Sequence, residues 1–533
     1  MEIPPLMAEQ YKQAKLLIEN SEDIKVYSHI DCDGICSGAI LSTILDRQGK
    51  EHEIEFVNLD VLDNIELTHK LTIFSDLGSG QKIDTKAKKD NSILILDHHP
   101  PLRSLDYGDS KDFTYLEINP NHHGIDGSYY VCGGGLCYFL AKEFDYTDLS
   151  WIGILSAIGD MQNTQTGHFE GLNKIIQEDA INEGYLELEK SDLNIYGRNT
   201  RPLFIALSYF NDVKLPITNN QNETKALLDE LGIDSTINRV TPEEKDILEK
   251  IGILCDEDKD YTLTRQDRAI LKKELESIKL AETLPIYLSK EEYDILKQIN
   301  ARIKRKTLSD LNNSEKAKLY ASLNKMIANA VPGRYAKHIP KILLGDSYTF
   351  LLEDPGSFLR DGSEFSTAMN ACGRNHEEKI AMEVLKGDRE WALIELEEVS
   401  RRHRYNLATS MNKVADGNRI VECENLQYFD GSGIKPEIVG TITGMILGYC
   451  NWRKPIIGFT EIEDQKGYKI SLRCSRFLSY DGIHFGNIIR DVAQSVGGSG
   501  GGHSMACGAY IPLSKKSEFL EKFNEKLNGK IAK

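Results

Sequence analysis

The sequence lacks several features that mark particular classes of protein. Its ten cysteines include no CxxC pair, so neither a zinc ribbon nor a disulfide framework is indicated. No run approaches the roughly 20 apolar residues of a membrane span. The N-terminal run MEIPPLMAEQ lacks the basic and then apolar layout of a signal peptide. We therefore expect a cytoplasmic protein with no membrane partner.

An excess of positive charge is also missing. The chain has 64 Lys and Arg residues against 82 Asp and Glu residues, which gives a formal net charge of -18. A protein that coats nucleic acid over its whole surface is usually basic, so any polyanion must be met at a local site that has its own cations. A nuclease is still compatible with this charge, because a carboxylate-rich metal site itself adds negative charge.

The hydrophobic pattern of the first third alternates between strand-like and helix-like runs. IKVYSH is followed by GICSGAILSTIL, and then by the strand-like runs EIEFVNLD, KLTIFSDLG, SILILDHH and FTYLEINP. Two helices are expected near residues 127–143 and 148–161. This alternation predicts an α/β fold with a doubly wound, mainly parallel sheet. Such sheets bind ligands at the carboxyl ends of their strands.

The 533-residue chain is too long for one core, and its composition changes along its length. We predict a metal-binding domain over residues 1–215 and a helical insert over residues 222–330, where Lys/Glu-rich helices such as TPEEKDILEKIGIL dominate. No chemistry is visible in the insert, which favours a structural or partner-binding role. Strand-like runs (HIPKILLG, PIIGFT, YKISLRC) then return, and they predict a second, smaller α/β domain over residues 335–533.

Acidic and histidine side chains follow the expected strands at the points where the strands end. In the run SHIDCD, extended chain would place His29, Asp31 and Asp33 on one face, while Cys32 packs away from them. The other strand and helix ends contribute five more such groups. These are Asp76, Asp97, His98, His99 and Asp160. One such carboxylate is commonplace as a helix cap, but four separate clusters indicate a shared site.

The chemical types of these side chains indicate which ions the site would hold. Carboxylate oxygens and imidazoles without thiolates suit Mn²⁺ or Mg²⁺, and the histidines favour Mn²⁺. The groups exceed what one ion needs, whereas two ions about 3.5 to 4 Å apart would use them. A pair of divalent ions activates water and binds phosphoryl oxygens, so we expect hydrolysis of a phosphoester.

The ordered set of motifs resembles a known family. HIDCDG, SDLG, DHH and the GD that contains Asp160 are similar, in order and spacing, to the four motifs of the DHH phosphoesterase superfamily. KISLRCSR followed by VGGSGGGHSMACG resembles its DHH-associated C-terminal domain. EFSTAMNACGR at residues 364–374 and NPNHHGIDGSYYVCGGGLCYFLAKE resemble the RecJ-like branch, particularly its archaeal members. The resemblance covers about residues 1–215 and 335–515.

The resemblance implies a role for each of these side chains. It divides the ligands between two metal ions, with His29 and Asp31 on one, Asp33, His98 and Asp160 on the other, and Asp76 between them. His99 would face the scissile phosphate as a cation or hydrogen-bond donor. Asp97 is either a ligand or a group that orients a neighbouring ligand, and we favour the orienting role.

The glycine-rich run near the C-terminus is the expected substrate-binding loop. Backbone N–H groups of successive glycines approach an anion closely, and side chains add positive charge. The predicted substrate-binding residues are Arg473, Arg476, Gly500, Gly501, Gly502 and His503. Strand alternation cannot place Arg473 and Arg476 on one face, so Arg476 would reach the substrate only from a different direction than Arg473. A flexible linker is the alternative interpretation of the glycine run.

The leading functional hypothesis is a metal-dependent exonuclease that acts on single-stranded DNA or RNA, in replication or repair. Within the same chemistry, the alternative substrates are short oligonucleotides or cyclic dinucleotides. A hypothesis of another class is a replisome scaffold without catalysis. The complete ligand set favours an enzyme over the scaffold. By resemblance to archaeal relatives, a GINS-type replication complex is a further expected partner, and the helical insert is the candidate surface for it.

Two other groups of basic residues carry weaker predictions. His122 and His123 lie in a turn rich in Pro, Asn and Gly, so we expect them to be exposed. The run RRHRYN at residues 401–406 is compatible with contact to a nucleic-acid backbone, but short basic runs are more often solvated faces of helices.

Overall fold

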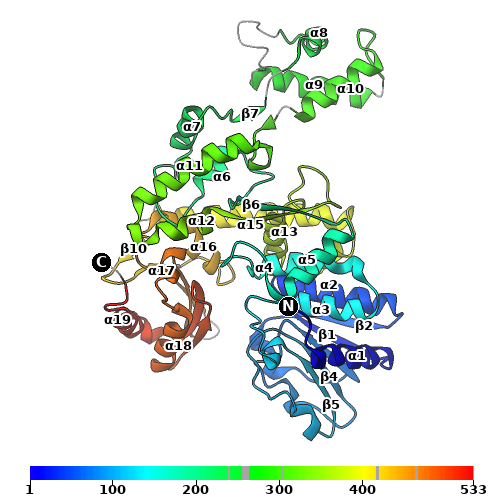
Figure 1. The fold of residues 1–533 in the computed structure, drawn as a ribbon, viewed down its shortest axis with the longest axis vertical. Helices are drawn as coiled ribbons and strands as arrows, with labels where there is room; N and C mark the ends of the chain where they lie inside the picture. The colour runs from blue at the N-terminus through cyan, green and yellow to red at the C-terminus, as the bar shows by residue number, and fades with distance from the viewer. Residues whose placement is uncertain are drawn as a thin grey trace. The chain divides into compact units, whose positions relative to one another are not determined.

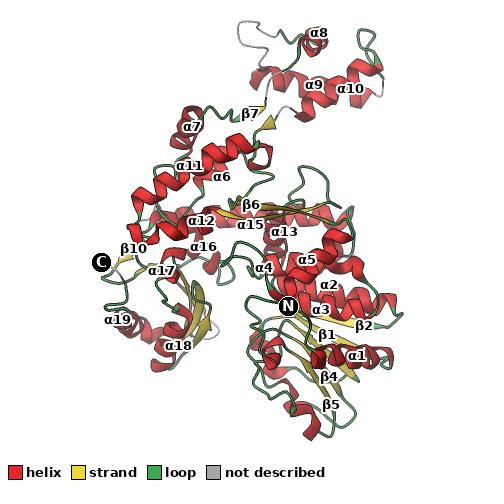
Figure 2. Ribbon diagram, viewed as in Figure 1, coloured by secondary structure: helices red, strands yellow, loops and turns green. Residues whose placement is uncertain are grey.

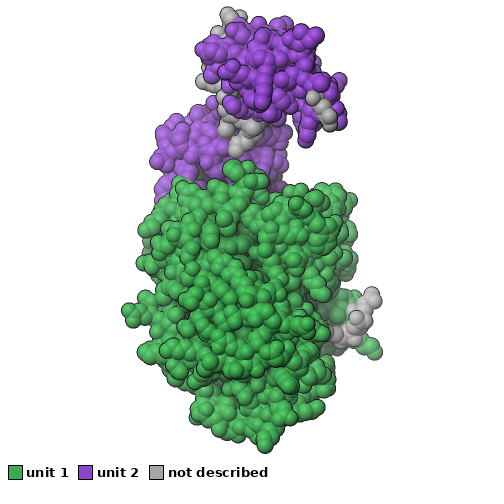
Figure 3. All heavy atoms as spheres, turned by 90° about the vertical axis from the view of Figure 1, so that its right-hand side faces the viewer, with its two compact units in different colours: residues 1–196, 211–215, 323–533 green, residues 197–210, 216–322 purple. Residues whose placement is uncertain are grey.

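The computed structural model, drawn in Figures 1 and 2, describes residues 1–237, 240–254, 263, 265–281, 283–302, 304–415, 419–462 and 466–531. It divides into two compact units, which Figure 3 colours separately. Unit 1 comprises Met1–Tyr196, Asn211–Leu215 and Leu323–Lys533, and unit 2 comprises Gly197–Phe210 and Pro216–Ser322. No helix in the described part of the chain is both long enough and apolar enough to cross a bilayer. The domain bounds of the sequence analysis stay predictions.

The N-terminal part of unit 1 is built on a five-stranded sheet in the order β2-β1-β3-β4-β5. Its strands are β1 (Ile24–His29), β2 (His52–Val57), β3 (Leu71–Ser75), β4 (Ser92–Leu96) and β5 (Thr114–Ile118). All neighbouring pairs are parallel, so the prediction of a parallel sheet is confirmed. The carboxyl ends of these strands therefore lie at one edge of the sheet (Figure 1).

The two faces of this sheet are covered differently. Alternate strand residues such as Val26 and Ile73 pack in a large core with four helices. These are α1 (Pro5–Glu19), α2 (Cys32–Arg47), α3 (Gly133–Glu143) and α4 (Ser150–Gly159). Residues of the opposite parity, such as Phe74, pack against Leu62 and Ile83 from the 3₁₀ turns η1 (Leu59–Asn64) and η2 (Ile83–Lys86). The second covering layer thus consists of short turns.

Segments distant in sequence complete this core. They are α5 (Gly171–Asn182), β6 (Leu186–Leu193), β9 (Leu344–Phe350), α13 (Gly362–Gly373), α14 (Glu378–Leu385) and α15 (Trp391–Ala415). β6 and β9 pair antiparallel, and Phe365 of α13 is buried in the same core as α2 and α4. The run HIPKILLG was predicted as a strand, but its first part forms α12 (Ile339–Leu343). Pro340 lies in the first turn of α12, where its missing N–H costs nothing.

Unit 2 is mainly helical, as the sequence predicts for this region. Its helices are α6 (Leu203–Ser208), α7 (Gln221–Glu230), α8 (Pro242–Lys250), α9 (Arg265–Ala281), α10 (Lys290–Arg302) and most of α11 (Asn313–Ala330), with the short strands β7 (Thr236–Ile237) and β8 (Lys304–Arg305). The side chain of Thr241 accepts from the N–H of Glu244, and the two residues form a capping box at the start of α8. Leu248, Ile253 and Leu296 belong to a core of this unit's own.

The C-terminal part of unit 1 contains a second sheet, in the order β10-β11-β12-β13-β15-β14. Its elements are β10 (Ile420–Glu422), β11 (Gln427–Asp430), α16 (Val439–Met445), β12 (Ile456–Ile462), β13 (Gly467–Arg473), α17 (Arg476–Tyr480), α18 (Phe485–Ser495), β14 (Ser499–Gly502), β15 (Ala506–Pro512) and α19 (Lys516–Lys526). β11 and β12 are parallel, and the other pairs are antiparallel. The glycine run expected as a loop is the edge strand β14.

Candidate metal centre and phosphate site

The carboxyl end of β1 and the start of α2 supply the first three predicted ligands. β1 ends at His29, and Asp31 caps α2, where its Oδ1 accepts a hydrogen bond from the N–H of Gly34 (3.1 Å). Asp33 already lies in the first turn of α2. The prediction that one strand face carries all three side chains is therefore wrong beyond His29. Extended alternation cannot continue once the chain turns into a helix at Cys32.

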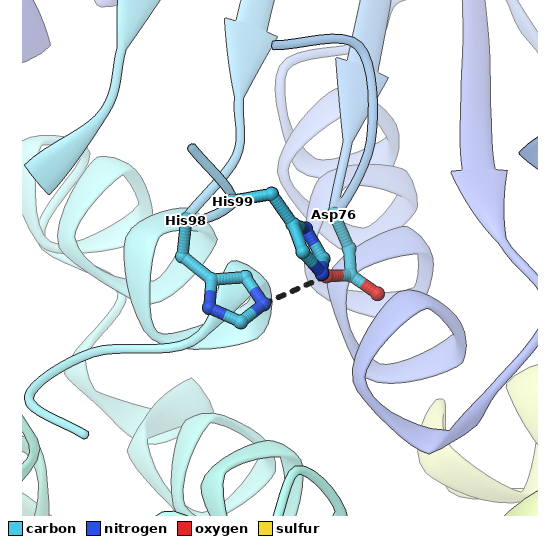
Figure 4. A group of neighbouring side chains, drawn as sticks. All are labelled: Asp76, His98 and His99. Atoms are coloured by element: carbon cyan, nitrogen blue, oxygen red, sulfur yellow. Dashed lines mark ion pairs between the residues drawn. The ribbon is translucent and has the colours of Figure 1, made fainter. Parts of the chain in front are cut away.

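Asp76 lies between two histidines. It follows β3 directly and is 2% exposed. Its Oδ1 is 3.2 Å from Nε2 of His98, and its Oδ2 is 3.4 Å from Nδ1 of His29. Figure 4 shows the Asp76 carboxylate beside the His98 and His99 rings, with the His98 pair dashed. Asp76 has a φ of 58°, a left-handed conformation that Asp tolerates better than most residues.

The six predicted ligands form two groups that meet at Asp76. His29, Asp31 and Asp76 offer ligand atoms that all lie within 4.8 Å of one another, and so do Asp33, His98 and Asp160. In the second group, Nε2 of His98 is 3.5 Å from Asp33 Oδ2 and 3.8 Å from Asp160 Oδ2. The structure thus brings together the same two sets that the family resemblance implies.

Backbone groups hold the second set in place. The N–H groups of Gly133 and Gly134, at the start of α3, donate to Oδ2 and Oδ1 of Asp33 (2.8 and 2.7 Å). Nδ1 of His98 lies 2.7 Å from the carbonyl oxygen of Gly127. Since a carbonyl oxygen only accepts, Nδ1 carries a proton, and Nε2 is the ring nitrogen that remains available to a metal. This is the tautomer that binds a metal through Nε2.

The carboxylates alter the protonation of the two histidines. Burial acts to lower the pKa of His29, but the charges of Asp31 and Asp76 raise it well above its usual value. Burial likewise acts against a charged His98, and the surrounding carboxylates, Asp160 first among them, raise its pKa well above the usual range. The neighbouring carboxylates thus favour the protonated form of both imidazoles.

The carboxylates in turn respond to burial and to each other. Burial and the charge of Asp76 raise the pKa of Asp33 well above its usual value. Burial raises the pKa of Asp160 to about 6, although His98 acts in the opposite direction. Burial would raise the pKa of Asp76 as well, but His29 and His98 lower it below the usual range. Such crowding of like charges in a buried place indicates a site built for cations.

The site also has buried ligand atoms that the rest of the described chain does not satisfy. Nδ1 of His29, Oδ1 of Asp76 and Nε2 of His98 have no hydrogen-bond partner among the described residues. Buried polar atoms are rarely left in this state unless an ion or water meets them. These residues therefore fit a divalent metal, and the oxygen and imidazole donors suit Mn²⁺ or Mg²⁺.

Asp97 and His99 form a pair beside this centre. The buried Asp97 accepts from the N–H of Ser79 (2.9 Å) through Oδ2 and from the N–H of His99 (3.1 Å) through Oδ1. Nδ1 of His99 is 2.8 Å from Asp97 Oδ1, and the His99 side chain is 50% exposed. These contacts favour the orienting role for Asp97. Burial acts to lower the pKa of His99 and so does the charge of His98, but Asp97 helps to raise it above the usual value.

Arg374 is a candidate site residue that the sequence analysis did not single out, although it ends the quoted run NACGR. It follows α13, where Gly373 is so close to the first motif that a Cβ would lie 1.8 Å from the Ile30 carbonyl oxygen. Burial and the charge of Arg473 lower the pKa of Arg374, whereas the charge of Asp31 raises it. Two arginines that repel each other beside a carboxylate cluster are suited to bind phosphate.

The predicted substrate residues of the C-terminal sheet are placed unequally. Arg473 ends β13, and its Nη1 donates to the Leu472 carbonyl oxygen (2.8 Å). Arg476 instead makes a two-pronged ion pair with Asp212, with Nε to Oδ1 at 2.9 Å and Nη2 to Oδ2 at 2.5 Å. The structure thus ties Arg476 to a carboxylate that is not one of the candidate metal ligands.

Strand β14 carries Gly500, Gly501 and Gly502, and His503 follows it. Gly502 has a φ of 123°, and a Cβ there would lie 2.8 Å from Cα of Cys507, so only glycine fits. Burial and the charges of His98 and His99 lower the pKa of His503. His503 is therefore within electrostatic range of the DHH histidines.

The weaker predictions have mixed outcomes. The His122 side chain is only 7% exposed, with Nε2 3.6 Å from Glu117 Oε1, so the prediction of an exposed histidine pair is wrong for His122. Cys32 is buried, as expected for a packing residue. In the run 401–406, Arg401 pairs with Glu398 (2.7 Å). Contact of this run with nucleic acid stays a prediction.

Comparisons with known proteins add to this geometry. Residues 423–529 match the DHHA1 domain family. An uncharacterised protein of Methanocaldococcus jannaschii is 27% identical over 511 residues, covering 94% of this chain and 92% of the relative. CDC45 of Entamoeba histolytica shares the fold with a TM-score of 0.51 at 12% identity, over 98% of this chain and 99% of that one.

A second solved structure, Mn²⁺-bound RecJ of Thermus thermophilus, has a TM-score of 0.50 at 12% identity. The match covers 99% of this chain and 55% of that RecJ, so this chain spans about half the length of the RecJ structure. The DHHA1 match, the RecJ fold and the clustered Asp and His motifs occur together in one chain. The chain has the RecJ fold and contains a DHHA1 domain. Arg473 and the glycines of β14 fall within the DHHA1 match.

Proposed function

We propose that this protein is a metal-dependent phosphodiesterase that removes nucleotides from the ends of single-stranded DNA or RNA. The observation that supports the proposal most is the position of Asp76, whose two oxygens face two different histidines in two groups of metal-binding side chains. In a two-metal mechanism one cation lies beside the attacking oxygen and one beside the leaving oxygen of the phosphate, and this arrangement supplies places for two of them.

Each side chain then has a role in holding the centre. His29, Asp31 and Asp76 would bind one ion, and Asp33, His98 and Asp160 would bind the other, with Asp76 shared. Two bound divalent ions supply an activated water and neutralise charge on the phosphoryl oxygens. The tautomer of His98 is fixed by the Gly127 carbonyl oxygen, and Asp33 is held by the N–H groups at the start of α3.

The chain's other residues would bind and orient the substrate. His99 is half exposed, and Asp97 fixes its ring and stabilises its protonated form, so its Nε2–H is a donor for a phosphoryl oxygen. Arg374 and Arg473 would bind a phosphate of the strand, because an anion beside them would offset the charge of Arg473 that disfavours the charged form of Arg374. His503 and the N–H groups of β14 would contact the nucleotide.

The proposal is tested with strands blocked separately at the 5′ and 3′ ends, in DNA and RNA versions, with Mn²⁺ or Mg²⁺ supplied after the protein has been stripped with a chelator. We expect mononucleotides from strands with one free end and no products without metal. Equal cleavage of strands blocked at both ends, or activity that survives chelation, would contradict the proposal. Preference for di- to tetranucleotides or cyclic dinucleotides would favour the oligonucleotide alternative.

A non-catalytic scaffold is the alternative of another class. None of the six expected ligand positions is vacant in this chain, and a protein that had lost catalysis would be free to lose one. We propose that residues 222–330 serve a partner rather than the reaction, since none of the candidate site residues lies in them. A GINS-type complex stays a prediction for that partner, and binding of the full chain to such a complex tests it.

A further inference from the structure

The strongest unused feature near the metal centre is a buried pair of amides, Gln162 and Asn173. Gln162 is 3% exposed and Asn173 is 0% exposed. The Nε2 group of Gln162 donates to Oδ2 of Asp160 (2.8 Å) and to the carbonyl oxygen of Gly127 (2.8 Å). That carbonyl oxygen also accepts from Nδ1 of His98 (2.7 Å). One amide group therefore contacts Asp160 directly and His98 through a shared acceptor.

Asn173 fixes which way the Gln162 amide points. Its Nδ2 donates to Oε1 of Gln162 (2.5 Å), so the oxygen faces Asn173 and the NH₂ group faces the two acceptors. Asn173 is anchored in turn, because its backbone N–H donates to the carbonyl oxygen of Tyr130 (2.9 Å) near the start of α5. The reversed amide would put an oxygen against the Asp160 carboxylate, which is unfavourable in a buried place.

The backbone explains why Gln162 reaches back to Asp160. Helix α4 ends at Gly159, and the next turn contains Met161 in a left-handed conformation with a φ of 57°. The N–H of Gln162 then donates to the carbonyl oxygen of Ala157 (3.1 Å), which closes the helix end. Met161 is 61% exposed, so its own side chain gains little from this position. The turn brings the side chain of Gln162 beneath Asp160.

We propose that the Asn173–Gln162 pair is a positioning device that holds Asp160 and His98 in one mutual geometry and so sets the metal affinity of the Asp33–His98–Asp160 group. The proposal rests on the metal centre of the proposed function. Gln162 and Asn173 are positioning residues, since each acts on the ion through a ligand. Groups of this kind, which orient metal ligands from behind, change metal affinity about 10- to 100-fold when they are removed.

The test is titration of the metal-stripped protein with Mn²⁺. Binding is monitored by calorimetry and by the electron paramagnetic resonance signal of the free ion. The variant is Gln162→Met, which keeps the length of the side chain and removes both donors. The matched control is Gln165→Met, the same change in an exposed residue whose Nε2 donates to the Tyr129 hydroxyl (2.5 Å) and not to a candidate ligand.

We expect two Mn²⁺ sites in the wild type and in Gln165→Met. In Gln162→Met one site should weaken about 10- to 100-fold while the other is unchanged. Asn173→Leu, which removes the donor to Gln162 and keeps the ligands and Gln162 in place, should weaken the same site to a smaller extent. Circular dichroism melting of each metal-free variant shows whether it is folded, and raising the Mn²⁺ concentration should restore activity to Gln162→Met.

Wild-type affinity at both sites in folded Gln162→Met would overturn the positioning role, and so would equal weakening of both sites. If Gln162→Met does not fold, the same outcomes are judged on Asn173→Leu. Different outcomes decide the proposed function. A wild type that binds two Mn²⁺ ions without cleaving any strand would refute the nuclease and leave the positioning role supported by the binding data, whereas a wild type that binds no Mn²⁺ would refute both.

Discussion

Nε2 of His98 lies 3.2 Å from Oδ1 of Asp76, and neither atom makes a hydrogen bond within the described chain. The other oxygen of Asp76 faces His29. One carboxylate thus connects the two groups of candidate ligands, and its loss affects both. The first prediction follows from this shared position.

Asp76→Asn should lower nuclease activity by more than about a hundredfold, because removing a shared ligand costs more than removing a group that only orients one. Asn also tolerates the left-handed backbone of Asp76, so the fold should be kept. Calorimetry should find fewer than two Mn²⁺ ions per chain. The matched control is Asp145→Asn, the same change in an exposed residue with a φ of 62°. Full activity in Asp76→Asn would remove Asp76 from the centre.

Asp160→Asn should have opposite effects on stability and on metal binding. In the metal-free chain, burial and the charge of Asp76 act against the Asp160 carboxylate and His98 offsets only part of this, so its pKa is raised to about 6. Removing one charge should stabilise the metal-free protein by about 1 to 3 kcal/mol, while Mn²⁺ affinity falls.

Thermal unfolding at neutral pH, with chelator and with Mn²⁺, measures both effects of Asp160→Asn. The variant should unfold at a higher temperature than the wild type in chelator and gain less from Mn²⁺. A lower unfolding temperature in chelator would show that the carboxylate stabilises the apo fold instead.

Gly373→Ala should destabilise the protein, although alanine is normally the better helix former. A Cβ at this position would lie 1.8 Å from the carbonyl oxygen of Ile30, so α13 or the first motif must move. The cost of such overpacking is about 1 to 3 kcal/mol, measured by urea unfolding. Gly444→Ala in α16 is the control, because its nearest neighbour would be Cγ of Arg473 at 3.9 Å, an ordinary contact. Equal stability of the two variants would contradict the close approach.

The parallel sheet and the clustering of the candidate ligands were predictable from the sequence for a local reason. An apolar strand followed by Asp or His marks its own carboxyl end, and parallel strands bring such ends to one edge. The local pattern failed where the chain changes conformation inside a motif. Asp33 follows a strand by four residues, but the helix that begins at Cys32 directs it to the second group.

Features that depend on distant segments were not predictable in the same way. The turn around His122 has a composition typical of exposed loops, yet the carboxylate of Glu117 on β5 lies beside its ring. The pairing of Arg476 with Asp212 joins residues that are 264 positions apart. Nothing near either residue in the sequence signals that contact, and strand alternation after β13 left both arginines open as substrate residues.

The two arginines predicted to bind substrate, Arg473 and Arg476, should respond differently to the same substitution. Arg473→Met should raise the KM for a single strand about 10- to 100-fold, because a charged hydrogen bond to phosphate is worth about 1.5 to 3 kcal/mol. The stability of Arg473→Met should change little, since the hydrogen bond of Arg473 within the described chain is to a carbonyl oxygen and no carboxylate is left unpaired.

Arg476→Met would leave the carboxylate of Asp212 unpaired, and the Asp212 side chain is only 14% exposed. Breaking such a pair costs about 3 to 5 kcal/mol, so Arg476→Met should unfold at lower urea with its KM unchanged. Steady-state kinetics and urea unfolding of both variants measure the contrast. A raised KM with normal stability in Arg476→Met would place Arg476 in the substrate site after all, because the ion pair with Asp212 would then have to open when the strand binds.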